Sequence, residues 1–130
     1  EIEIDTLGNP IGKQDQYAAS FGGINLIEFG KNGDVIVSPI ALKQETLREM
    51  SGRFLMFYTG ERRSADDILG DQVSNLERDE SHLDSTSLLV DLAYELYSQL
   101  QDNNIDNIGS ILHQGWEIKQ RLSDNITNDY

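Results

Sequence analysis

Apolar and polar positions in the first 50 residues follow the pattern of a short helix and a β-hairpin. Residues 24–29 form a β-prone run, residues 35–38 form a second one, and an Asn-Gly pair at 32–33 lies between them. Such a pair between two such runs is the strongest short-range hairpin signal, so we predict an antiparallel hairpin. The small residues within 15–21 favour a closely packed helix, and the glycines at 22–23 end it.

The pattern changes after Ser51-Gly52, where we expect a break in the chain. Residues 53–58 are a nearly continuous apolar run, which is typical of a buried strand. A helix is predicted to follow the capping box at 64–67. Two more helices are predicted from apolar stripes, one through Leu89, Leu92, Ala93, Leu96 and Leu100, and one through Ile105, Ile108, Ile111, Leu112, Trp116 and Leu122. We expect the turn 102–104 to cap the last helix.

These elements predict an α+β fold that consists of a β-hairpin plus a buried strand with three or four helices. Residues 1–50 and 51–130 differ in composition, and Met50–Gly52 is the natural seam between them. We therefore expect two structural parts that meet at this seam.

Composition narrows the classes of partner. The chain has 130 residues and a formal net charge of −13, which argues against nucleic acid or an anionic membrane as a partner, because both require clustered Lys and Arg. We interpret most acids as the solvated faces of helices. The chain has no Cys, no apolar run long enough to span a bilayer and no Met at its start, so we expect a cytoplasmic protein that is processed or part of a longer one.

Candidate chemistry centres on Asp15, which follows a Pro/Gly turn and opens the first predicted helix. Two interpretations of the residues stand. Asp15 caps the helix, or its carboxylate accepts the proton of an alcohol during phosphoryl transfer. Lys13 is a nearby cation that would keep Asp15 ionised, and Gln16 would orient a substrate hydroxyl or lie on the surface. Tyr17 fits packing better than chemistry.

A second candidate region joins the predicted strand to the helix after it. Thr59 and Gly60 form a turn, and Arg62 and Arg63 precede a helix N-terminus, where an anion binds well. The alternative is that both arginines pair with surface acids. His82 and His113 are isolated, and we identify no metal site.

The stretch from Pro10 to Gly23 has the form P-x-G-x-x-D-Q-x-A-A-x-x-G-G. It resembles the GHMP small-molecule kinases, and within them the D-glycero-D-manno-heptose 7-phosphate kinases. The resemblance implies a partial GHMP kinase fold, with 1–50 as the end of the N-terminal lobe and 51–130 as the start of the helical C-terminal lobe. It also implies that Asp15 faces the hydroxyl being phosphorylated.

The same resemblance implies roles for the neighbouring residues. Lys13 would be the cationic neighbour of Asp15, and Gly12 and Gln16 would lie beside the substrate. The Tyr-Thr-Gly-x-x-Arg pattern also recurs in the heptose branch, so Thr59, Gly60 and Arg63 would face the sugar phosphate, with Arg63 favoured over Arg62. The run Gly115–Lys119 is a third match; we interpret Trp116 there as a core anchor and Lys119 as a solvated lysine.

Two glycine-rich loops of these kinases are absent from the sequence, including the ATP-binding run P-x-x-x-G-L-x-S-S-S. We therefore expect the middle of a kinase that uses ATP and Mg²⁺ to phosphorylate the anomeric hydroxyl of a heptose 7-phosphate-like sugar. By itself the chain is expected to be inactive and to self-associate through exposed apolar faces. The alternatives are a kinase for another sugar, of the fucose or galactose type, and a non-catalytic acidic helical interaction module.

Overall fold

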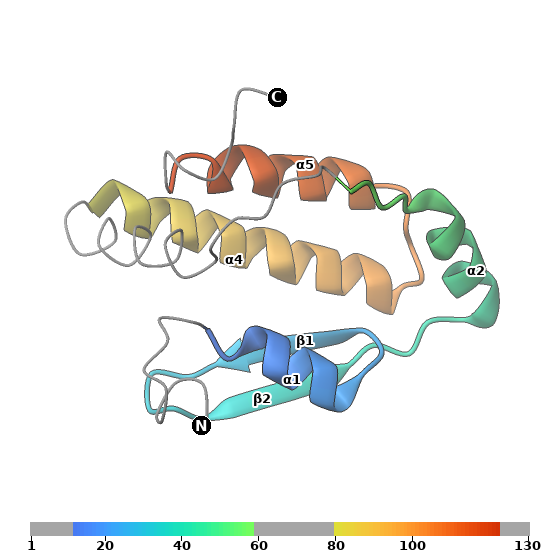
Figure 1. Cartoon of the computed structure of the whole chain (residues 1–130), viewed down its shortest axis with the longest axis horizontal. Coiled ribbons are helices and arrows are strands. Elements are labelled where there is room, and N and C mark those ends of the chain that lie inside the picture. The colour runs from blue at the N-terminus through green and yellow to red at the C-terminus, as the bar shows by residue number, and fades with distance from the viewer. Residues whose placement is uncertain (1–11, 59–79, 123–130) are drawn as a thin grey trace. The chain divides into compact units, whose positions relative to one another are not determined.

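The computed structural model describes residues 12–58 and 80–122 (Figure 1). These residues fall into two compact units. One unit combines residues 12–56 with 93–108, and the described part of the other comprises 57–58, 80–92 and 109–122. The elements in chain order are α1 (Gln14–Phe21), β1 (Asn25–Phe29), β2 (Val35–Pro39), α2 (Gln44–Arg53), α4 (Glu80–Gln101) and α5 (Ile108–Lys119).

The predicted hairpin is confirmed. β1 and β2 pair antiparallel, with Ile27 opposite Val37. In the turn the Gly30 N–H donates to the Asp34 carbonyl at 2.8 Å, and the Gly33 N–H donates to the Gly30 carbonyl at 3.0 Å. Gly33 has a φ of 86°, a conformation that costs other residues about 1–2 kcal/mol. The Asn-Gly signal therefore succeeds for the expected steric reason.

The first predicted helix is also confirmed. α1 ends at Gly22, which has a φ of 64° and whose N–H donates to the Ala18 carbonyl at 2.9 Å. Tyr17 fixes the helix against the hairpin, because its ring meets Phe29 of β1 edge-on at 5.8 Å and stacks with Phe21 at 6.3 Å. Aromatic pairs of this kind contribute about 0.5–1.5 kcal/mol beyond their burial. The interpretation of Tyr17 as a packing residue is confirmed.

The expected break at Ser51-Gly52 is wrong, because both residues lie inside α2. The helix is stabilised at its start by a distant side chain: Asn103 Oδ1 accepts hydrogen bonds from the Lys43 N–H at 2.6 Å and from Thr46 Oγ1 at 3.3 Å. The turn at 102–104 exists as predicted, but Asn103 caps α2 and not the last helix. The low helix propensity of Gly52, a cost of about 1 kcal/mol, is outweighed by tertiary contacts.

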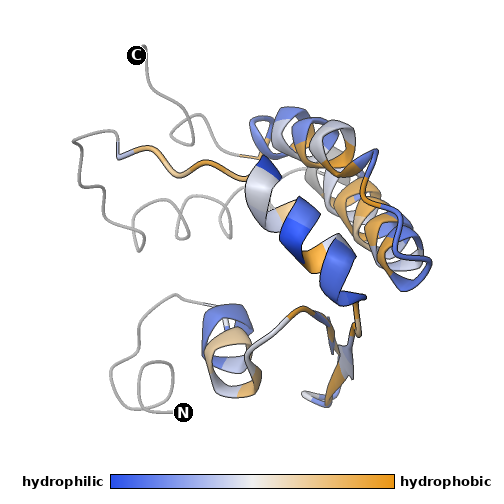
Figure 2. Cartoon of the chain, turned by 90° about the vertical axis from the view of Figure 1, so that its right-hand side faces the viewer, coloured by the Kyte–Doolittle hydropathy of each residue, from blue (hydrophilic) through white to orange (hydrophobic). Residues whose placement is uncertain are grey.

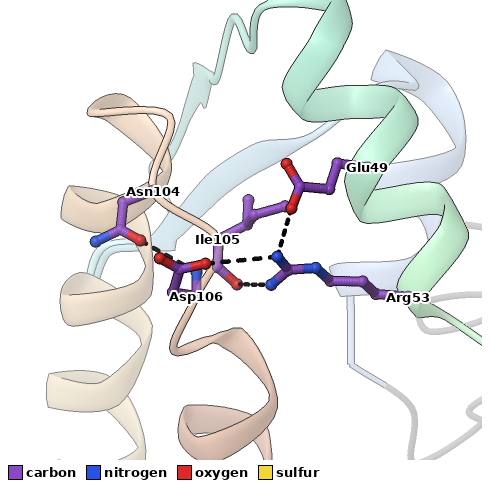
Figure 3. Close-up of polar contacts among 5 residues, drawn as sticks. All are labelled: Glu49, Arg53, Asn104, Ile105 and Asp106. Carbon is purple, nitrogen blue, oxygen red and sulfur yellow. Dashed lines mark hydrogen bonds and ion pairs between the residues drawn. The ribbon is translucent and has the colours of Figure 1, made fainter.

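Arg53 fixes the other end of α2 to the loop that follows α4 (Figure 3). Its guanidinium donates to the Ile105 carbonyl at 3.2 Å, to Glu49 Oε1 at 2.5 Å and to Asp106 Oδ1 at 3.4 Å. The Arg53 side chain is 44% exposed, so solvent screens both ion pairs and each contributes well under about 1 kcal/mol. The consequence is geometric: both ends of α2 are attached to the loop at 103–106.

The core of this unit lies between α2, the hairpin and the end of α4. Leu100, Ile105 and Ile108 are buried at its centre. The half-buried side chains packed around them are Ile24, Ile40, Leu42, Met50 and Leu96. Leu100 lies on α4 and is buried, as predicted. Ile105 is buried too, but it lies in the loop before α5, so its predicted place on the stripe of the last helix is wrong.

In the other unit, the first half of α4 packs against α5. A Cβ added at Gly115 would lie 3.8 Å from a methyl of Leu89 and 3.9 Å from one of Leu92, so the absence of a side chain lets the helices approach closely. Ile111 is buried, whereas Leu112 and Trp116 are 48% and 42% exposed. The interpretation of Trp116 as a core anchor is wrong, because its position on α5 leaves much of the indole in solvent.

The predicted buried strand at 53–58 is not formed. Arg53 is the last residue of α2, and residues 54–58 follow it without regular structure, with all five side chains exposed. Figure 2 shows this segment as a hydrophobic stretch that leaves the end of α2. A strand needs a neighbouring backbone to satisfy its N–H and C=O groups, and the paired strands among the described residues are β1 and β2 alone.

The α+β class is confirmed by a two-stranded antiparallel hairpin and four helices among the described residues. The helix predicted after residue 64 lies outside those residues. Within the described part of the chain, no helix is long and apolar enough to cross a membrane.

Candidate functional site

The candidate site residues Gly12, Lys13, Asp15 and Gln16 lie together at the start of α1. Lys13 occupies the N-cap position with helical backbone angles, φ −83° and ψ −7°, and no side chain caps the helix. Asp15 and Gln16 follow in the first turn, and all four residues are exposed. A Cβ at Gly12 would meet nothing within 4 Å, so the chain leaves open space around this turn.

Asp15 does not cap α1. The N-cap is Lys13, and the Asp15 carboxylate has no hydrogen bond or ion pair with any other residue that the structure describes. The capping interpretation is therefore wrong for this residue. A carboxylate in the first turn of a helix still interacts favourably with the positive end of the helix dipole.

The packing of Tyr17 determines where Asp15 points. Residues two apart on a helix differ by about 200° around its axis. Because Tyr17 faces Phe29 of β1, Asp15 starts from the opposite side of α1 and extends into solvent. The oxygen atoms of its carboxylate are thus available to a ligand.

Lys13 and Asp15 are close in sequence, but within 12–58 and 80–122 neither belongs to an ion pair. The expected role of Lys13 as a direct partner of Asp15 thus has no contact to support it. Thr59, Gly60 and Arg63, together with Arg62, lie outside the described residues. The structure brings together the first half of the candidate site and does not place the second.

A pocket of about 370 Å³ opens beside the start of α1. Gln14 of α1, Asn25 of β1 and Tyr97 of α4 supply polar groups to a wall that is otherwise mostly apolar. Asn25 Nδ2 donates to the Gly22 carbonyl at 2.7 Å, and the Tyr97 hydroxyl accepts from Gln101 at 2.8 Å, so both have an internal partner. The pocket is therefore better suited to apolar contact than to binding a charged group.

A polar contact between Glu28 of β1 and Tyr94 of α4 was not foreseen from the sequence. The Tyr94 hydroxyl donates to Glu28 Oε1 at 2.5 Å. This hydrogen bond and the nearby negative charge raise the pKa of Tyr94. The two residues are 66 positions apart, and nothing in the local sequence of either one signals the pairing.

Among the described residues, no group of three or more His, Asp or Glu side chains is placed to hold a metal ion. The described part of the candidate site, at the start of α1, offers no ligand set for Mg²⁺, and we assign no metal ligand among residues 12–58 and 80–122.

Comparison with known proteins finds two relatives, both named as sugar kinases. Over 129 residues the chain is 34% identical to D-glycero-alpha-D-manno-heptose 7-phosphate kinase of Campylobacter jejuni subsp. jejuni serotype O:2. The matched stretch covers 99% of the chain and 38% of that kinase. The resemblance to sugar kinases is confirmed. A second relative of this kind is the bifunctional fucokinase/GDP-fucose pyrophosphorylase of Arabidopsis thaliana, 27% identical over 127 residues, or 95% of the chain and 12% of that protein.

The chain thus spans 38% of the length of its heptose 7-phosphate kinase relative. The similarity extends over nearly the whole chain, so it includes α1 and the candidate residues of its first turn. No protein-family model matches the chain, and no solved structure does.

Proposed function

We propose that this chain is the central part of a sugar kinase that phosphorylates the anomeric hydroxyl of heptose 7-phosphate or a close relative. The observation that carries the proposal is the 34% identity to a heptose 7-phosphate kinase over 99% of the chain. The fucokinase relative is less similar, at 27%, and makes fucose the second candidate sugar. In this proposal residues 1–50 end the N-terminal lobe and 51–130 begin the C-terminal lobe.

The proposed role of Asp15 is to accept or orient the proton of the attacking hydroxyl. Phosphoryl transfer demands little covalent chemistry of a protein, and positioning and charge stabilisation dominate. The exposed Asp15 carboxylate, which has no partner among the described residues, is free to accept this hydrogen bond. Its place in the first turn of α1 holds it on a rigid element whose other side is fixed by Tyr17.

The neighbouring residues receive roles of lower specificity. Lys13, exposed at the N-cap of α1, would interact with negative charge on the substrate rather than with Asp15. Gly12 and Gln16 would border the sugar. Thr59, Gly60 and Arg63 would hold the sugar phosphate, with Arg63 as its anchor.

ATP would supply the phosphoryl group and Mg²⁺ would neutralise its charge in the complete kinase. Two features speak against either group binding to the chain alone: the family's glycine-rich loops are absent from the sequence, and no metal-ligand cluster occurs among the described residues. We therefore propose that the isolated chain neither binds ATP well nor catalyses transfer.

A chimeric kinase tests this proposal. The stretch of the Campylobacter jejuni kinase that matches this chain is replaced by residues 1–130, and transfer of phosphate from ATP to heptose 7-phosphate is measured. The chimera is expected to be active. The change Asp15→Asn is expected to lower kcat by about 100-fold or more, because a positioned general base contributes about 10²–10⁴-fold.

The matched control is Glu45→Gln, since Glu45 is an exposed acid in the first turn of α2. This change removes the same charge from an equivalent helix position and is expected to leave kcat unchanged. Near-normal kcat for a folded Asp15→Asn chimera would contradict the assignment. Activity of the chimera on fucose but not on heptose 7-phosphate would replace the proposed substrate.

A further inference from the structure

The segment Phe54–Tyr58 is the longest run of consecutive exposed apolar residues in the described chain. The exposed fractions are 53% for Phe54, 80% for Leu55, 99% for Met56, 80% for Phe57 and 81% for Tyr58. Isolated exposed apolar residues are ordinary, but contiguous exposed apolar surface marks a site of interaction. The segment therefore consists of apolar side chains that are normally buried, yet all five are exposed to solvent.

Its backbone is prepared for pairing. Phe54 has extended angles, φ −97° and ψ 132°. Among the backbone hydrogen bonds between described residues, none involves positions 55–58. A segment whose backbone groups lack partners among the described residues can gain them by strand addition, in which main-chain hydrogen bonds supply the affinity.

The side chains indicate an interior strand. In a strand, Phe54, Met56 and Tyr58 would lie on one face and Leu55 and Phe57 on the other. Both faces are apolar, which is the pattern of a strand covered on both sides. Edge strands are normally protected by charges or Pro, and the segment contains neither.

Net charge and chain length indicate which backbone would pair with the two edges of a strand at residues 54–58. A second copy of the chain would bring another net charge of −13 to the interface, which opposes association. The chain covers only 38% of the heptose 7-phosphate kinase that it resembles, so most of such a protein lies outside it.

We propose that residues 54–58 form an interior β-strand whose two neighbours are strands from the part of the kinase outside this chain. This inference rests on the proposed function, in which the chain is part of a larger enzyme. The segment contributes little to the fold of the isolated chain and becomes ordered when the remaining kinase is joined to it.

Hydrogen exchange of the amides at 55–57 tests the inference. In the isolated chain these amides are expected to exchange at the rate of an unstructured peptide. In the chimeric kinase they are expected to be protected by about 100-fold or more, as in paired strands of a core. Protection in an inactive chimera would support the strand while the proposed function fails, and free exchange in an active chimera would overturn the strand alone.

The two methionines of the chain provide a matched pair of variants. Met56→Lys is expected to leave the urea midpoint of the isolated chain unchanged and to abolish protection in the chimera. Met50→Lys is expected to lower the midpoint of the isolated chain, because Met50 packs against the Leu100 core. If Met56→Lys lowers that midpoint as much, the segment is already packed within this chain and the inference is wrong, whether or not the chimera folds. Protection in the isolated chain that increases with concentration would also overturn it, in favour of a second copy.

Discussion

The β-hairpin and the segment Phe54–Tyr58 are both strand-like in sequence, yet only the hairpin forms a sheet. β1 finds its partner β2 a few residues away, across a turn that Gly33 makes sterically easy. The segment 54–58 is more apolar than either strand but has no paired neighbour among the described residues. The difference shows that an apolar sequence alone does not form a strand, because a strand also needs a neighbouring backbone with which to form hydrogen bonds.

The hairpin and the segment Phe54–Tyr58 also differ in how they contact the core. The hairpin is joined to the rest of its unit through Ile24 and Ile40, which flank it and pack against the Leu100 core. Within the described part of the chain, none of residues 54–58 packs against this core.

The largest contrast is between Leu100→Ala and Met56→Ala. Leu100 is 5% exposed, so its truncation is expected to lower the free energy of unfolding by about 2–5 kcal/mol. Met56 is 99% exposed, and its truncation is expected to change stability by less than about 0.5 kcal/mol. Urea denaturation of the isolated chain measures both. Equal losses would show that the exposed segment is part of the core.

A second prediction concerns Asn103, which has a φ of 56° and caps α2. Asn103→Gly removes the capping side chain but leaves a residue that adopts a positive φ readily. Asn103→Ala removes the cap and also places an unfavourable residue at this positive φ. We expect losses of about 1 kcal/mol for Gly and about 2 kcal/mol for Ala. Denaturation midpoints followed by circular dichroism give the two values. If neither change alters the midpoint, α2 does not depend on the distant cap.

Two glycines test whether backbone conformation decides which elements form. Gly33→Ala is expected to destabilise the chain by about 1 kcal/mol, because its φ of 86° is unfavourable for Ala while a Cβ there meets no atom within 4 Å. Gly52→Ala, inside α2 and equally unobstructed, is expected to stabilise by about 1 kcal/mol. The same sign for both changes in a thermal unfolding series would contradict this reasoning.

The smallest expected effect concerns the contact between β1 and α4. Because the hydrogen bond to Glu28 raises the pKa of Tyr94, the protonated hydroxyl stabilises the folded chain. This contribution is complete below the unfolded pKa of about 10 and is lost as the pH rises through the folded value. Tyr94→Phe should remove that alkaline loss, and Glu28→Gln should lower the Tyr94 pKa in a phenolate absorbance titration. An unchanged titration would show that the contact does not form in solution.

Local signals predicted the elements that depend on local interactions. The Asn-Gly turn, the glycine end of α1 and the stripes of α4 and α5 were read from spacing alone, because each element satisfies its backbone within itself or with a near neighbour. α2 was missed because its stability comes from Asn103 and Arg53 contacts between positions over 50 residues apart. The strand predicted at 53–58 does not form, because it finds no paired neighbour among the residues that the structure describes.

In the candidate site, too, the features set by local interactions are predictable from the sequence, and those set by distant contacts are not. The exposure of Asp15 follows from helix geometry and from Tyr17, and both are local. The N-cap position of Lys13 was not foreseen, since Asp is the better capping residue on intrinsic preference. Glu28 and Tyr94 could not be paired from a single sequence, because only the folded chain brings β1 and α4 together.

The central claim is that this chain is the middle of a sugar kinase and is catalytically incomplete by itself. The most direct test is to measure ATP-dependent phosphorylation of heptose 7-phosphate by the purified 130-residue chain and by the chimeric kinase in the same assay. We predict turnover by the chimera and none by the isolated chain. Robust turnover by the isolated chain, or a folded chimera that phosphorylates no sugar, would contradict the account.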